Sequence, residues 1–175
     1  MKGSRLLFSG LALIFGLFVV AMSLASANQV VSYGGSASAK SFYLSGKILP
    51  DHLVYPLVAI VDRVVLTIAP VQEKIQLQLA YCCIRLDYAR DLLAKGQSGM
   101  AMAALTKSQK YCGLAAQQSL DHEIQGDLRR QVVDELAQNI EQTQNLIFEF
   151  SPDQCGFANQ LHQHNQFLLD QLKAE

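Results

Sequence analysis

The stretch that most constrains the fold of this chain is a long amphipathic segment from Val71 to Lys95. Its apolar residues recur at intervals of four and three, which is the spacing of one buried face on a helix in a helical bundle. This stripe consists of Ile75, Leu79, Cys82, Leu86, Ala89 and Leu93. Lys95-Gly96 predicts the end of the helix, because a cation suits the last turn and glycine adopts the left-handed conformation that follows it.

A second helix is expected to return directly after this turn, beginning near Ser98 or Gly99. Its small residues allow two helices to approach closely; they are Ala101, Ala103, Ala104, Ala115 and Ala116. A short connection makes the two helices antiparallel neighbours. The sequence therefore predicts a helical hairpin folded about Gly96-Gln97.

Another helix is expected before the hairpin. Pro56 suits a first helical turn, and Pro70 ends the segment. Asp62 and Arg63 lie on the side opposite to an apolar stripe of Leu57, Ile60, Val61, Val64, Val65 and Ile68.

Two more helices are expected after the hairpin. Asp127 can cap the first of them, which carries Leu128, Val132, Leu136, Ile140, Thr143, Ile147 and Phe150 on one stripe. Ser151-Pro152-Asp153 is a turn, and the last helix is marked by Phe157, Leu161, Leu168 and Leu172. Residues 49–175 are thus predicted to form an all-α domain, an antiparallel helical hairpin or a bundle of about five helices.

The N-terminus has the pattern of a secretory signal peptide. Lys2 and Arg5 precede an apolar run over residues 6–24, and Ala25-Ser26-Ala27 is a small-x-small cleavage motif. We expect residues 1–27 to be a signal peptide cleaved between Ala27 and Asn28. An uncleaved anchor is the alternative, because the run is long enough to span a bilayer. Both alternatives place the rest of the chain outside the cytoplasm, as a periplasmic, secreted or outward-facing membrane-anchored protein.

Residues 28–48 are rich in serine and glycine and show no sustained period, which predicts a flexible linker. The formal net charge of −1 gives no overall field that would attract nucleic acid or anionic lipid. Membrane contact is therefore expected only through the N-terminal helix, if that helix is uncleaved.

Three motifs resemble an uncharacterised family of exported bacterial helical domains, a domain of unknown function. They are Leu49-Pro50-x-His52-x-x-Tyr55-Pro56-Leu57, Leu79-Ala80…Arg85-Leu86…Ala89-x-x-Leu92-Leu93-x-x-Gly96, and Ala104-Leu105 in the return segment. The chain differs from that family in having Val58 where lysine is favoured, in Ser108 or Tyr111 near a favoured tyrosine, and in its paired cysteines. The resemblance implies a signal or anchor, a spacer and a helical module, and it implies no known activity.

Four cysteines in an exported chain suggest disulfide bonds. Folding the hairpin about Gly96-Gln97 places Cys82 opposite Cys112, so this pair is the first candidate bridge. Cys83 is an alternative partner for Cys112, and Cys83 with Cys155 is a second candidate pair. Buried free thiols that act as small apolar groups are the other alternative.

The remaining polar residues predict no catalytic, cofactor or metal site. His162 and His164 are two residues apart on a helix and point in nearly opposite directions, whereas His52 and His122 are isolated. No nucleophile-elbow, phosphate-loop, dinucleotide or zinc-protease motif occurs in the sequence.

We therefore expect an exported, non-enzymatic helical module of the bacterial envelope, with a structural or interaction role and another envelope protein as its partner. Such a module would bury a partner's apolar face in a groove between helices. Two alternatives remain: a small periplasmic enzyme or ligand carrier with a site inside the bundle, and a membrane-tethered regulator that senses the envelope state.

Overall fold

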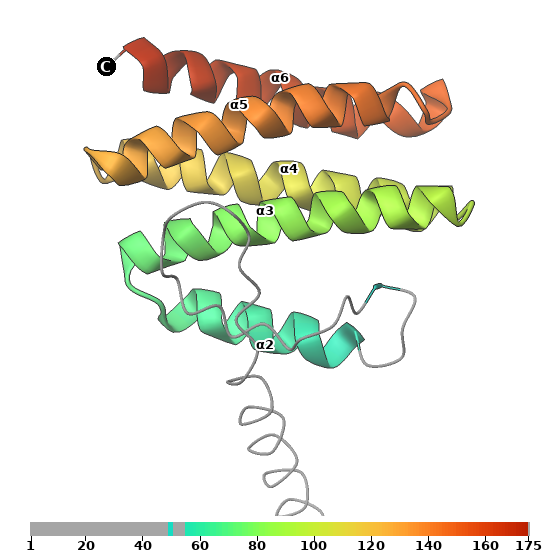
Figure 1. The fold of residues 1–175 in the computed structure, drawn as a ribbon, viewed down its shortest axis with the longest axis horizontal. Coiled ribbons are helices and arrows are strands. Elements are labelled where there is room, and N and C mark those ends of the chain that lie inside the picture. Colours follow the sequence, from blue (N-terminus) through green and yellow to red (C-terminus); the bar gives the residue numbers. More distant parts are fainter. Residues whose placement is uncertain (1–48, 51–54, 175) are drawn as a thin grey trace, which may run out of the picture. The chain divides into compact units, whose positions relative to one another are not determined.

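The structure, a computed structural model, describes residues 49–50 and 55–174. Within these residues it consists of helices without strands (Figure 1), so the predicted all-α class is confirmed for this part of the chain. The helices are α2 (Tyr55–Ile68), α3 (Val71–Ala94), α4 (Ser98–Asp121), α5 (Asp127–Ile147) and α6 (Pro152–Ala174). The expected signal peptide (1–27), its cleavage site at Ala27–Asn28 and the linker (28–48) lie outside the described residues. Among the described helices, none has the length and apolar character needed to cross a membrane.

The predicted hairpin is present as α3 and α4, and α5 and α6 form a second antiparallel pair beside it (Figure 1). Gly96 has a φ of 74° at the end of α3. The amide of Gly96 donates to the Leu93 carbonyl at 2.8 Å and that of Gln97 to the Leu92 carbonyl at 2.9 Å. Both bonds satisfy carbonyls that the helix end leaves free. The glycine stop expected at this position is therefore confirmed.

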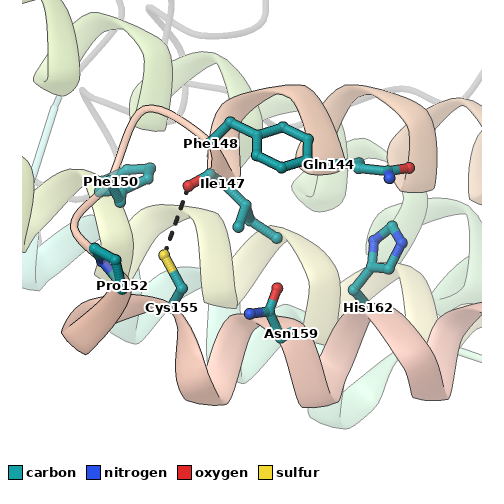
Figure 2. A pocket seen from close by; sticks show the side chains of 8 residues that line it. All are labelled: Gln144, Ile147, Phe148, Phe150, Pro152, Cys155, Asn159 and His162. Atoms are coloured by element: carbon teal, nitrogen blue, oxygen red, sulfur yellow. Dashed lines mark hydrogen bonds between the residues drawn. The ribbon is translucent and has the colours of Figure 1, made fainter.

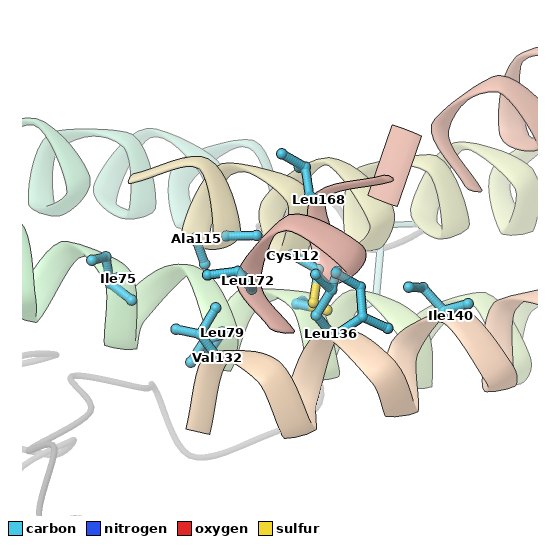
Figure 3. Packing of buried hydrophobic residues seen from close by; sticks show 12 residues of the cluster. Ile75, Leu79, Cys112, Ala115, Val132, Leu136, Ile140, Leu168 and Leu172 are labelled. Atoms are coloured by element: carbon cyan, nitrogen blue, oxygen red, sulfur yellow. The ribbon is translucent and has the colours of Figure 1, made fainter. Parts of the chain in front are cut away.

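Helix α4 is the central element, because it packs against α3, α5 and α6. The core consists of two clusters along the bundle. Figure 3 shows the first, where α3 begins and α4 ends, with buried residues that include Ile75, Leu79, Cys112, Ala115, Val132, Leu136 and Leu168. The second lies at the opposite end and includes Leu92, Ala101, Leu105, Phe150, Cys155 and Ala158.

Buried polar side chains fix how α6 lies on α4. The Gln109 side-chain amide donates to the Ala158 carbonyl at 3.1 Å, and the Asn165 amide donates to the Gln109 carbonyl at 3.0 Å. Gly113 makes the close approach possible, since a Cβ at this position would lie 2.5 Å from Asn165 Oδ1. Each amide can form its bond at only one register, so this pair specifies the contact more sharply than apolar packing alone.

In α3–α6 most residues of the predicted stripes are buried. The structure departs from the sequence predictions for these four helices at four points. Asp127 does not cap α5; Gly126 precedes the helix at a φ of 74°, and no side chain caps that end. Helix α5 ends at Ile147 instead of continuing to Phe150. Ala103 and Phe157 are exposed, because α4 and α6 turn other residues toward their neighbours.

Helix α2 differs from the other helices in which side it turns inward. Asp62 is buried, and its carboxylate accepts a hydrogen bond from Arg85 Nη2 on α3 at 2.8 Å. Ile60 and Ile68 are 60% and 76% exposed, and Val61 and Val64 are also exposed. Asp62 therefore faces the bundle, whereas Arg63 and much of the apolar stripe of α2 face away from it.

Aromatic rings complete the contact around this ion pair. The Arg85 guanidinium lies 5.2 Å from the ring centre of Tyr55 and 5.3 Å from that of Tyr88, distances at which a cation is attracted to an aromatic face. Burial raises the pKa of the Asp62 carboxyl, and the Arg85 charge opposes that shift. The Tyr81 hydroxyl also favours the ionised form of the Asp62 carboxyl and so acts to lower its pKa.

Candidate functional site

A pocket of about 350 Å³ lies where α5 meets α6, beside the turn that joins them (Figure 2). One part of its lining is apolar or weakly polar and comes from Ile147, Phe148, Phe150, Pro152 and Cys155. The other part is polar and comes from Gln144, Asn159 and His162. This volume accommodates a large side chain or a small ligand.

The turn after α5 determines how the two phenylalanines lie. Phe148 keeps a helical conformation, and the amides of Glu149 and Phe150 donate back to the carbonyls of Leu146 and Ile147 at 3.0 and 3.2 Å. This tight turn buries Phe150, which is 8% exposed, and leaves Phe148 78% exposed. A bulky apolar ring thus lies in solvent at the edge of the pocket.

Cys155 joins the start of α6 to the end of α5. Its thiol lies 3.5 Å from the Ile147 carbonyl, the contact drawn in Figure 2, and 3.2 Å from the Ser151 carbonyl. A thiol is a weak donor. These carbonyls belong to a helix end and to the following turn, where carbonyls lack partners within the helix. The contacts help to hold the apolar side of the pocket in place.

The polar side of the pocket has unused hydrogen-bonding capacity. Figure 2 shows the side chains of Asn159 and His162 extending from α6 toward α5. His162 Nδ1 is buried and has no hydrogen-bond partner among the described residues. A ligand group bonds this nitrogen only if the imidazole turns toward the pocket, and the bond would then remove the penalty of leaving the nitrogen unpaired.

A second pocket, of about 180 Å³, lies between α3 and α5. Several of its polar groups are bonded to each other or to neighbouring side chains, whereas Asn139 Oδ1 is buried without a partner among the described residues. Arg90 pairs with Asp87 at 3.2 Å, the Cys83 thiol lies 3.3 Å from Glu135 Oε2, and Asn139 donates to Ser108 Oγ at 2.9 Å. Since a ligand would have to displace these contacts, this pocket is the weaker candidate site.

All four cysteines are free in the structure, so neither expected disulfide is present. Cys82 and Cys112 do share one core cluster, as the hairpin prediction required. The Cys82 sulfur, however, lies 3.6 Å from Ser108 Oγ, one helical turn before Cys112, and the Cys112 thiol faces the Glu135 carbonyl at 3.7 Å. Burial raises the pKa of the Cys82 thiol. These two residues pack as small buried groups.

The second candidate pair, Cys83 and Cys155, is held apart by the fold. Cys83 is partly exposed on α3 next to Glu135, where the neighbouring Cys82 thiol and partial burial raise the pKa of its thiol. Cys155 belongs to the core cluster at the α5–α6 turn. A bridge between them would require a different arrangement of α3 and α6.

The histidines are not gathered at one point. His162 lines the pocket on α6, His164 is exposed, His122 follows α4, and His52 lies outside the described residues. Among the residues that the structure describes, no group of three His, Cys, Asp or Glu side chains is arranged to hold a metal ion.

The sequence patterns do not predict this pocket. They place Phe150 on the buried stripe of α5, and they bear on His162 only as a metal ligand, a role that its spacing from His164 argues against. One feature of the sequence does point to the site: Phe148 and Phe150 are two residues apart at a helix end, so one core face cannot bury both.

No protein-family model, curated protein or solved structure matches this chain. The resemblance to the exported helical family therefore stays a prediction, and the α5–α6 pocket is the feature of the described residues that bears on function.

Proposed function

We propose that this chain is an exported, non-enzymatic module of the bacterial envelope that binds another envelope protein through the α5–α6 pocket. The observation that carries this proposal is Phe148, which is 78% exposed beside a pocket of about 350 Å³. Aromatic residues at the edge of a concave surface are typical anchors of protein–protein contacts. The export pattern at Lys2, Arg5 and Ala25-Ser26-Ala27 supports the envelope location.

Burial of apolar surface from both partners would provide the favourable free energy of binding. A bulky apolar side chain transferred into the pocket gains about 1.5–3 kcal/mol, and covering the Phe148 ring adds a gain of the same kind. Cys155 and the tight turn hold the pocket wall in place before binding. Less conformational freedom is then lost when the partner docks.

The lining of this pocket is better suited to binding than to acid–base chemistry. His162 and Cys155 are its only titratable side chains, and the Cys155 thiol already faces two backbone carbonyls. A general acid–base mechanism needs a positioned group that exchanges a proton with the substrate. His162 alone lacks a carboxylate in the lining that would orient it.

Site-specific photocrosslinking in the bacterial envelope tests the proposed function. A photoreactive residue replaces Phe148 in the full chain, and Gln125, exposed in the loop between α4 and α5, serves as the control position. We expect one protein to crosslink from position 148 and not from position 125.

A matched pair of substitutions then tests the role of the ring. The readout is the amount of that same protein that co-purifies with the chain. Phe148→Ser is expected to reduce this amount by about tenfold or more, whereas Phe167→Ser is expected to leave it unchanged. Phe167 is a suitable control because it is 57% exposed on α6 and does not line the pocket. Equal capture by both variants would show that the pocket is not the binding site.

A further inference from the structure

The charges of the helical module are unevenly distributed along the chain. Residues 131–172, which include most of α5 and α6, contain six acidic residues and neither lysine nor arginine. The acidic residues are Asp134, Glu135, Glu141, Glu149, Asp153 and Asp170. The lysines and arginines of the described helices lie on α2, α3, α4 and the first turn of α5. Lys173, near the end of α6, is the exception. This asymmetry is hidden by the net charge of −1.

Two of these acids flank the α5–α6 pocket. Glu149 lies between Phe148 and Phe150, and Asp153 follows Pro152, so both are next to residues of the lining. Both are exposed. Lys95 lies in the α3–α4 turn at the same end of the bundle, and it already takes part in another interaction. Two exposed carboxylates therefore adjoin residues of the lining in sequence, and residues 131–172 contain no lysine or arginine to neutralise them.

The interior of the pocket adds a second chemical requirement. Its apolar part is formed by Ile147, Phe148 and Phe150, and its polar part by the side chains of Gln144, Asn159 and His162. A side chain that suits both parts has a flat apolar body and a hydrogen-bonding tip. Tyrosine has this form, since its ring is apolar and its hydroxyl donates or accepts.

We propose that the partner segment is cationic and inserts a tyrosine into the α5–α6 pocket, between lysines or arginines that face Glu149 and Asp153. This inference rests on the proposed function and specifies the chemistry of its partner. Opposite charges around an apolar anchor accelerate association and select the partner, whereas the anchor provides most of the affinity.

Binding of defined peptides to the full chain tests the proposal. The probe is a fluorescent alanine-based peptide with a central tyrosine and two lysines on each side. Its comparison peptides replace the lysines by glutamates, or the tyrosine by alanine. We expect the lysine–tyrosine peptide to bind at least about tenfold more tightly than either comparison peptide, and its affinity to fall as salt is added.

Variants of the protein then locate the charges. The double variant Glu149→Gln, Asp153→Asn is expected to weaken binding of the lysine–tyrosine peptide by about fivefold, because two exposed ion pairs are removed. The matched control is Asp121→Asn, Glu123→Gln, which neutralises two exposed acids at the opposite end of the bundle and is expected to change affinity less than about twofold. A further peptide carries phenylalanine in place of the central tyrosine. His162→Phe is expected to reduce the preference for the tyrosine peptide over this one, because the variant has no ring nitrogen to bond the hydroxyl.

Several results would overturn the inference. Equal binding of the lysine and glutamate peptides, an unchanged affinity in the Glu149/Asp153 variant, or no peptide binding at all would each reject a cationic partner. If such a result appears while Phe148→Ser still reduces co-purification of the protein that was identified by crosslinking, the proposed function stands and only the partner chemistry is wrong. A dimer of the chain that dissociates on Phe148→Ser would show that a second copy fills the pocket, which also rejects the inference.

Discussion

In the bundle of α3–α6 the apolar stripes face inward, and the side chains of Ile75 and Leu136 are 0% exposed. Helix α2 does the opposite: it buries Asp62 and leaves Ile60 at 60% and Ile68 at 76% exposure. The four bundle helices share a large apolar contact, so burial of that surface determines how each is rotated. Among the described residues, helix α2 has few contacts with its neighbours, and there the Asp62–Arg85 pair and its tyrosines determine the rotation. An amphipathic pattern thus predicts the inward side of a helix only where apolar contact dominates.

The largest expected effect is in the bundle core. Leu136→Ala on α5 should lower the free energy of unfolding by about 3–5 kcal/mol, because Leu136 is fully buried and its removal leaves a cavity. Leu114→Ala is the matched control, since Leu114 is 47% exposed on α4 and should lose less than about 1 kcal/mol. Urea unfolding of both variants measures the difference. Similar losses would mean that α5 does not pack as described.

The next largest loss of stability is expected on substitution in the polar contact between α2 and α3. Arg85→Met leaves the buried Asp62 carboxylate without its charged partner, which should lower stability by about 2–4 kcal/mol. Arg90→Met is the control, because the Arg90–Asp87 pair has side chains 40% and 38% exposed and should contribute less than about 1 kcal/mol. Hydrogen exchange on Arg85→Met should show faster exchange in α2 than in α5. Protection of α2 equal to that of the parent would show that another contact holds this helix.

This contrast also explains what could be predicted from the sequence. The 4-3 stripe from Ile75 to Ala89 and the Gly96 stop are local patterns, and both are present in the structure. The rotation of α2 depends on a contact between Asp62 and Arg85, residues 23 apart in sequence, which periodicity does not encode. The same holds for the Gln109–Asn165 contact and for the pocket, whose polar and apolar sides come from two helices.

A substitution at Gly113 tests the close approach of α4 and α6. Gly113→Ala places a Cβ 2.5 Å from Asn165 Oδ1 and should lower stability by about 1–3 kcal/mol, although alanine favours a helix. Gly99→Ala is its control, because nothing lies within 4 Å of a Cβ at that position. This control should raise stability by about 0.5–1 kcal/mol. Thermal unfolding measures both, and shifts of the same sign would contradict the described helix contact.

The pH dependence of α2 is expected to be smaller and to have a definite sign. The folded-state pKa of Asp62 is raised by burial above its ordinary value of 3.8, so the folded protein binds this proton more tightly than the unfolded chain. Its contribution to stability is therefore fully present below pH about 3.8 and is lost as pH rises through the folded pKa. Asp62→Asn cannot titrate, so the parent should lose stability relative to this variant on going from that pH toward neutral. The opposite slope in urea unfolding would show that the Arg85 charge, rather than burial, dominates at Asp62.

The smallest expected effect is on the exposed stripe of α2, where apolar residues contribute little to the folded chain. The double variant Ile60→Gln, Ile68→Gln should change the free energy of unfolding by less than about 0.5 kcal/mol, because both side chains are mostly in solvent and glutamine favours a helix at least as well as isoleucine. Ile75→Gln is the matched control; the same exchange at a fully buried position of α3 should lower stability by about 3 kcal/mol or more, because it buries an amide and removes apolar packing. A loss above about 2 kcal/mol in the α2 variant would show that this stripe is covered in the intact protein. In that case α2 would follow the same rule as the bundle, and its apolar stripe would have a contact beyond the described residues.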